Sequence, residues 1–247
     1  MKEGKTHVFS LLPTAGVALA LLAVLGTVIA GQGTRWEVWH FRIGLAVLRW
    51  SVYAGICSFV LSAGSIFSSL ITKNRRALAL AVAGSIISCL LVGIPAFWSR
   101  QARQLPAIHD ITTDTDNPPQ FVAILPLRKN ASNPPGYGGP QIAEQQEAAY
   151  PRVSPLISPD SFDTVYDKVF VVARRLGWNI VDASRRDGRI EAVDSTFWFG
   201  FKDDIVIRIS PASKGTRIDI RSVSRVGVSD IGTNARRITK FLKAMGK

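Results

Sequence analysis

Three long apolar stretches within the first hundred residues constrain this chain more than any other feature. Residues 8–30 include no charged side chain, and two further apolar stretches cover residues 43–71 and 77–98. A helix rises about 1.5 Å per residue, so about twenty residues cross a hydrocarbon core of about 30 Å. The sequence therefore predicts a membrane α-helical region of three transmembrane helices within residues 1–106, with the lipid bilayer as its partner.

The first apolar stretch permits a second interpretation. Lys2 and Lys5 precede it, and Val28 and Ala30 would suit a signal-peptide cleavage site. The stretch is longer than the usual apolar core of about 7–15 residues in a signal peptide, which favours an uncleaved anchor.

Arg49 is the one charge inside the second stretch. Because it lies about two turns from the start of that stretch, we expect its long side chain to reach the membrane interface. The alternative is a polar path between helices, which would suit small-solute transport. Small side chains at helical spacing predict the close approach of a neighbouring helix; they are Ala54, Ser58, Ser62 and Ser65.

Basic residues predict the orientation, because cytoplasmic loops carry an excess of lysine and arginine. The N-terminus and the turn 72–76 share one side and carry five basic residues. The loop 31–42 and the segment after the third stretch share the other side and carry four. We therefore expect a bacterial inner-membrane protein with a cytoplasmic N-terminus and a periplasmic C-terminal domain.

The distribution of charge argues against nucleic acid as a partner. The net charge is +12, but residues 1–106 hold ten basic and two acidic residues, whereas residues 107–247 hold twenty and sixteen. Most of the basic excess therefore flanks apolar stretches, and the remainder lacks the basic footprint that phosphate-backbone binding needs. Both cysteines, Cys57 and Cys89, lie in the apolar stretches, so residues 107–247 have neither a disulfide nor a thiolate metal site.

Residues 107–157 are rich in proline and glycine, which predicts an extended wrap over the surface without a helix or a central strand. One short apolar run, residues 121–125, is expected either to add an edge strand or to lie along the domain.

Residues 158–247 predict a soluble α+β two-layer domain of helix, four-stranded antiparallel sheet and helix. Ser158 is expected to cap the first helix and Gly177 to end it, and Ser229 or Asp230 to cap the last. Alternating apolar and polar residues predict the four strands; they are residues 178–184, 189–197, 205–210 and 217–222. In the last pair, Arg208 is placed to pair with Asp219.

Few residues of the domain suggest chemistry. The only histidine after the apolar stretches is His109, so no Ser-His-Asp or Cys-His arrangement and no zinc site is predicted. Asp114 and Asp116 resemble the start of a calcium loop, but Pro118 and Pro119 follow, which favours an Asx turn. We predict no cofactor and no metal.

Asp203 and Asp204 are the one acidic pair that suggests acid–base work. Neighbouring residues of a strand point to opposite faces, so the two carboxylates cannot flank one substrate. A charged turn is the favoured interpretation, and a metal-independent enzyme with an Asp/Arg site is the alternative.

Two groups of residues are candidate binding sites. Arg221 and Arg225 share one strand face and lead into a helix N-terminus, which predicts an anion site; its members are Arg221, Arg225, Ser229, Asp230 and Asn234. The alternative is that Arg225 pairs with Asp230 or Asp194 and only holds the helix to the sheet. A cluster of aromatic residues suggests a pocket or a membrane-facing edge, with core packing as the favoured alternative; its members are Phe197, Trp198, Phe199 and Phe201.

The chain resembles the domain of unknown function 1499 family over about residues 107–246. The resemblance is carried by three motifs, at residues 113–119, 199–208 and 221–238. It implies a domain found largely on bacterial membrane or exported proteins, with plant relatives directed to plastids. No activity is established for the family, so the resemblance implies no catalytic residue. Position 228 is often basic in the family, and Val228 departs from that pattern.

Together these features predict a non-enzymatic membrane protein whose exported domain binds a ligand or partner at the cell envelope. The partner would be another envelope protein or an anionic small molecule.

Overall fold

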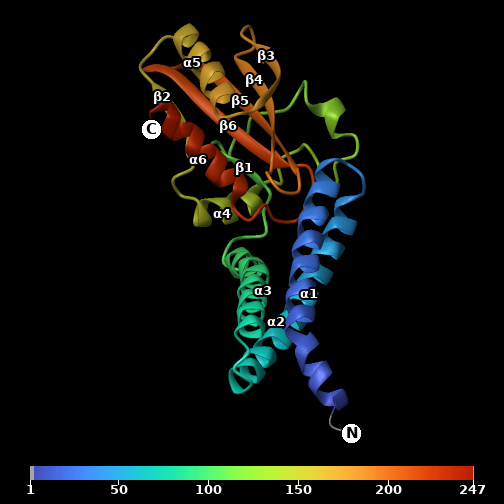
Figure 1. The fold of residues 1–247 in the computed structure, drawn as a ribbon. Coiled ribbons are helices and arrows are strands. Elements are labelled where there is room, and N and C mark those ends of the chain that lie inside the picture. The colour runs from blue at the N-terminus through green and yellow to red at the C-terminus, as the bar shows by residue number, and fades with distance from the viewer. Residues whose placement is uncertain (1–2, 247) are drawn as a thin grey trace. The chain divides into compact units, whose positions relative to one another are not determined.

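The computed structural model describes the backbone of residues 3–246 and the side chains of residues 11–246 (Figure 1). The chain divides into two compact units. The helical unit comprises Met1–Arg100 with the short segment Phe197–Gly200, and the sheet unit comprises Gln101–Thr196 with Phe201–Lys247.

The helical unit contains α1 (Glu3–Arg35), α2 (Phe41–Ile71) and α3 (Arg75–Ala102). Each helix is long and apolar enough to cross a membrane. Many of their large apolar side chains face outward, as expected of helices that contact lipid. These helices confirm the three expected apolar helices. Lys2 and the side chain of Lys5, which bear on the predicted orientation, lie outside the described residues.

Small residues bring the three helices together. The Ser58 hydroxyl donates to the main-chain oxygen of Gly16 at 2.8 Å, and the Ser88 hydroxyl donates to Ser58 at 2.8 Å. A methyl group at Gly84 would overlap the hydroxyl of Ser62. The predicted role of Ser58 and Ser62 in close helix approach is therefore confirmed.

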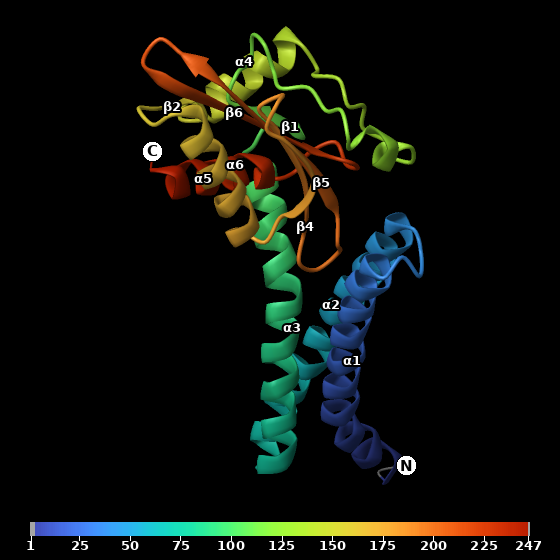
Figure 2. The same cartoon turned by 90° about the horizontal axis from the view of Figure 1, so that it is seen from above.

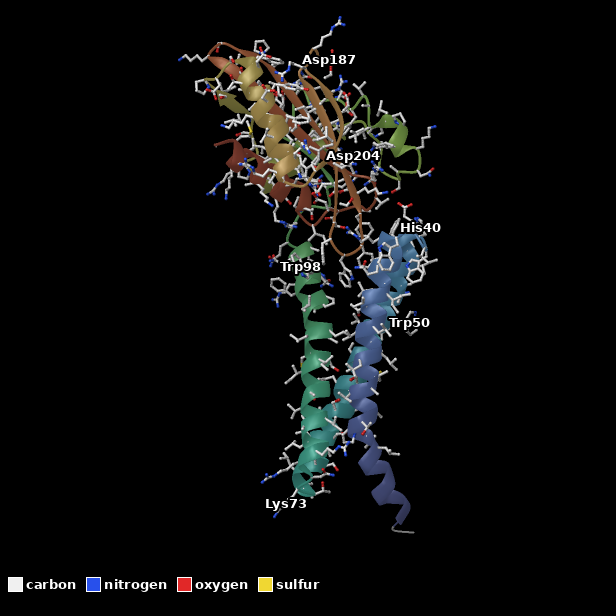
Figure 3. The ribbon with its side chains drawn as sticks, turned by 45° about the horizontal axis from the view of Figure 1, so that its top comes forward. His40, Trp50, Lys73, Trp98, Asp187 and Asp204 are labelled. Atoms are coloured by element: carbon white, nitrogen blue, oxygen red, sulfur yellow. The ribbon has the colours of Figure 1, made fainter. Side chains whose placement is uncertain are left out.

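The two ends of the helical unit differ. Lys73, in the turn between α2 and α3, lies at one end, while His40 and Trp98 lie toward the other (Figure 3). Arg49 is exposed on the outer surface of α2 rather than turned between helices. This position suits a side chain that reaches the interface.

The sheet unit is built on a six-stranded antiparallel sheet of order β1-β6-β5-β4-β3, with β2 also paired to β6. The α+β class and the four expected strands are confirmed; they are β3 (Asn179–Ser184), β4 (Arg189–Ser195), β5 (Lys202–Ala212) and β6 (Gly215–Ser224). The predicted count of four was wrong, because β1 (Asp110–Thr112) and β2 (Leu156–Ser158) both add to the free edge of β6. Strands of three residues are too short to show an alternating pattern.

Two helices cover one face of this sheet, α5 (Phe162–Arg175) and α6 (Thr233–Met245). Isoleucines of β4, β5 and β6 pack against their apolar sides to form the main core. Ser161, not Ser158, caps α5, because Ser158 belongs to β2. Gly177 follows the end of α5 with φ of +84°, as expected of a helix-ending glycine.

The opposite face is covered by residues 113–139, which we call the strap; Figure 2 shows it across the sheet from α5 and α6. Phe121 and Ile124 of the strap pack on Val206 and Val223. The run 121–125 therefore lies along the domain and adds no edge strand.

The expectation that no helix forms between residues 107 and 157 was wrong. A short 3-10 helix, η1 (Leu125–Arg128), lies in the strap, and α4 (Pro140–Ala149) follows it. Pro140 is the first residue of α4. The N–H group at this position makes no hydrogen bond within a helix, so proline, which lacks that group, is tolerated there.

Glu191 holds the strap to the sheet. Its carboxylate is fully buried and accepts hydrogen bonds from the main-chain N–H groups of residues 122, 123 and 124 at 2.9, 3.1 and 2.9 Å. Three N–H groups of an irregular segment are thereby satisfied by one side chain.

Candidate functional site

Arg221 of β6 lies on the strap-covered face and is fully buried. Its guanidinium donates two hydrogen bonds to Asp110, at 2.9 and 2.7 Å. It also donates to the main-chain oxygens of Pro119 at 3.2 Å and Pro135 at 2.9 Å. Burial raises the pKa of Asp110, and the charge of Arg221 opposes that rise. The Arg221 side chain therefore connects β1, β6 and the strap. Its hydrogen-bond donors are used within the domain and are not available to a ligand.

Arg225 pairs with Asp204, at 2.7 Å between Nη2 and Oδ1. The alternative that Arg225 pairs with Asp230 or Asp194 was wrong. Its side chain lies on the strap-covered face of β6, whereas Asp194 contacts Arg237 of α6 on the other face. Arg128 of the strap reaches the same carboxylate. Asp204 is fully buried, so it takes two arginines as partners and leaves no free anion.

Asn234 organises a second network, on the helix-covered face. Its amide oxygen accepts a hydrogen bond from Ser222 at 2.6 Å, and its amide nitrogen donates to Ser224 at 3.0 Å. Arg237 donates to the same amide oxygen and, at 2.6 Å, to Asp203. These contacts attach the start of α6 to the end of β6.

The five residues predicted as an anion site therefore divide between two places. Arg221 and Arg225 have their charged ends on the strap-covered face. Asp230 and Asn234 lie together at the start of α6, where the Asp230 carboxylate accepts the N–H of Asn234 at 2.7 Å. Ser229 accepts from a main-chain N–H of the same turn. Each of the five makes contacts that stabilise the domain.

Asp203 and Asp204 point to opposite faces of β5, as predicted. They are buried strand residues, so the expectation of a charged turn was wrong. Burial raises the pKa of Asp203, while Arg237 opposes that rise. Asp204 appears in Figure 3 within the sheet. The two carboxylates do not converge on one concave site, which the alternative of an Asp/Arg enzyme requires.

The four aromatic candidates do not share one environment. Phe197 is 89 % exposed and Phe199 is buried, while Trp198 and Phe201 are half-buried. The first three belong to the helical unit and Phe201 to the sheet unit.

Asp114 behaves as an Asx-turn residue. Its carboxylate accepts the N–H of Asn117 at 2.9 Å, as expected from the prolines that follow. Arg208 and Arg217 occupy the same carboxylate at 2.9 and 2.8 Å. Arg208 also pairs with Asp219, which confirms the predicted cross-strand pair. Among the residues with described side chains, no three metal-binding groups gather at one place.

Sequence reasoning missed an open groove of about 410 Å³ beside α6, which we call the α6 groove. Apolar groups form its floor and cations its rim. Its principal residues are Leu105, Tyr150, Ala235, Arg236, Lys240 and Lys243. Leu105 and Tyr150 are remote from α6 in sequence, so no local pattern could place them there.

Three cations of the α6 groove have no acidic partner. Arg236, Lys240 and Lys243 are spaced by four and three residues, so they follow one side of α6. All three are exposed, and within residues 11–246 no carboxylate lies within ion-pair distance of them. Arg236 is in the first turn, where the helix dipole disfavours a cation. Its guanidinium donates to the main-chain oxygen of Ile231 at 2.9 Å and to the hydroxyl of Thr233 at 3.1 Å, so Arg236 has neutral partners but no acid.

Tyr150 brings a hydroxyl to the same groove. The hydroxyl is buried and makes no hydrogen bond within the described part of the chain. Burial, and then the charge of Asp230, raise the pKa of Tyr150, so the phenol stays neutral and can donate. Gly232 borders it, since a side chain there would come within 3.2 Å of the hydroxyl. A neutral donor and three cations thus face one apolar groove.

One comparison with known proteins covers this region. A family model described as "Protein of unknown function (DUF1499)" matches residues 110–245, which confirms the resemblance predicted from the three motifs. The matched region starts at β1 and ends with α6, so it leaves out the three apolar helices. No curated protein matches the chain.

Proposed function

The chain belongs to the DUF1499 family, and on that premise we propose that its sheet unit is a binding domain for an anion that carries apolar groups. The α6 groove is the proposed site. The three apolar helices would hold this domain at a bilayer. An enzymatic role is not part of the proposal, since the candidate acids have committed partners on two separate faces.

One observation carries the proposal: the groove combines three cations that have no acidic partner with an apolar floor. The arginines of the sheet differ, because Arg208, Arg217, Arg221 and Arg225 all contact carboxylates. In contrast, Arg236, Lys240 and Lys243 on one side of α6 form no ion pair within the described residues. Cations that lack an acidic partner next to an apolar surface favour an amphiphilic anion as ligand.

Location and orientation belong to the same proposal. We place the protein in a bacterial inner membrane with its N-terminus in the cytoplasm and its sheet unit in the periplasm. Lys73, Arg75 and Arg76 support this, because three basic residues sit in or beside one short turn. A C-terminal reporter that is active only outside the cytoplasm tests it, and activity of a cytoplasm-only reporter would contradict it.

The binding function is tested on the full-length protein in a neutral detergent. Thermal unfolding is followed with hexyl phosphate as ligand, and with hexanol and inorganic phosphate as single-feature controls. A ligand at ten times its Kd adds about 1.4 kcal/mol, or a rise in Tm of about 3–6 °C for a domain of this size. We expect hexyl phosphate to give such a rise and each control ligand a smaller one.

Charge reversal assigns the effect to the groove. The variant Lys240→Glu/Lys243→Glu should lose the rise. Lys129→Glu/Lys214→Glu is the matched control, because both lysines are exposed and lie outside the groove, and it should keep the rise. Equal responses of the two variants would refute the proposed site.

A further inference from the structure

We infer that the ligand of the α6 groove is the phosphate-bearing headgroup of an anionic phospholipid in the same bilayer that the three helices cross. This inference rests on the proposed function and names its ligand class.

Chain length keeps the groove close to the membrane surface. Leu105, on the groove floor, comes three residues after Ala102, the last residue of α3. Three residues span at most about 11 Å when fully extended. The headgroup layer of one leaflet is about 5–8 Å thick. A lipid headgroup beside α3 is therefore within reach of the groove by covalent connection alone.

Charge favours an anionic lipid over a neutral one. The groove presents Arg236, Lys240 and Lys243, and Arg100 and Arg103 flank the end of α3 in the same short stretch of chain. Arg100 and Arg103 are exposed, as are the three groove cations. Clusters of basic residues next to a membrane helix attract anionic lipids.

The floor of the groove favours a lipid over a free phosphate. Leu105 and Ala235 are apolar, and Tyr150, whose hydroxyl is buried, lines the same groove. A phosphate ion would leave this apolar surface uncovered, whereas the glycerol and first acyl carbons of a lipid would cover it. The Tyr150 hydroxyl is placed to donate to a phosphate oxygen, which would satisfy the donor.

The test measures which lipids stay with the full-length protein. The protein is reconstituted in nanodiscs of equal parts phosphatidylcholine and phosphatidylglycerol, and retained lipids are counted by native mass spectrometry. We expect phosphatidylglycerol to be enriched on the wild-type protein. Lys240→Glu/Lys243→Glu should lower that enrichment by at least about tenfold, and Lys129→Glu/Lys214→Glu should preserve it.

A third variant separates a seated headgroup from diffuse attraction. Thr239→Trp fills the groove without changing its charge. It should also lose the enrichment; retention of phosphatidylglycerol by this variant would overturn the inference. Displacement of the lipid by excess glycerol 3-phosphate would overturn it too, because the ligand would then be soluble.

The two experiments distinguish failure of the lipid assignment from failure of the proposed binding function. If hexyl phosphate stabilises the protein through the groove lysines but all variants retain the same lipids, the binding function stands and the lipid assignment falls. If neither hexyl phosphate nor phosphatidylglycerol distinguishes the lysine variant from its control, both fall.

Discussion

Glu191 is the side chain whose replacement tests most directly how the strap is held to the sheet. Its Oε1 accepts the N–H groups of residues 122 and 123, and its Oε2 accepts that of residue 124. The change Glu191→Gln keeps the size of the side chain and replaces one of these two acceptors with an amide donor. Oε1 also lies 2.9 Å from Arg189 Nε, and the neutral glutamine loses this ion pair. The geometry of the site therefore predicts which interactions survive.

The glutamine oxygen can keep the two N–H groups that share Oε1. Its amide nitrogen then faces the N–H of Ile124, so one buried donor loses its acceptor. An unsatisfied buried N–H costs about 1–3 kcal/mol, and the two remaining hydrogen bonds lose the strengthening that a charged acceptor provides. We expect Glu191→Gln to lower the free energy of unfolding by about 2–4 kcal/mol.

Urea unfolding of the full-length protein in nanodiscs, read by pulse proteolysis of the sheet unit, measures this loss. With a slope of about 2 kcal/mol/M, the midpoint should fall by about 1–2 M. Glu144→Gln is the matched control, because Glu144 is exposed on α4, and its midpoint should stay within about 0.3 M of wild type.

Hydrogen exchange gives a local check on the same reasoning. The amides of residues 122–124 have Glu191 as their acceptor, so they should exchange faster in Glu191→Gln than in wild type. The reasoning is refuted if the midpoint of Glu191→Gln equals that of Glu144→Gln, or if the midpoint falls while these amides stay as protected as before.

Two further predictions concern the strap and the helices. Burial, and then the charge of Asp110, raise the pKa of Tyr137 to about 12, so the tyrosinate absorbance of the wild type should include one group that titrates near pH 12 and is missing from Tyr137→Phe. A raised folded-state pKa means that this contribution to stability is complete below pH 10 and is lost as pH rises toward 12, and Tyr137→Phe should remove that dependence; a normal titration would contradict the burial. In α3, Gly84→Ala should weaken the packing of the helical unit, because the added methyl meets a neighbouring helix, whereas Gly93→Ala, in open space, should be neutral or stabilising by up to about 1 kcal/mol. Thermal unfolding in detergent compares the two, and equal effects would contradict the helix packing.

Features that depend on long or regular runs of sequence were predictable. The three apolar helices follow from apolar stretches long enough to span a bilayer. Alternation predicted four strands and placed Asp203 and Asp204 on opposite faces of β5. In each case the information lies within one continuous segment, so local physics determines the outcome.

Features that depend on which segments meet were decided by the tertiary structure. β1 and β2 exist because the edge of β6 offers unpaired hydrogen-bonding groups, and three residues carry no pattern of their own. The partner of Arg225 is Asp204 rather than Asp230, because strand alternation turns its charge away from α6. The α6 groove needs Leu105 and Tyr150 beside a helix that starts at Thr233. Sequence periodicity reports the environment of one segment, whereas a site assembled from distant segments is determined only when the chain folds.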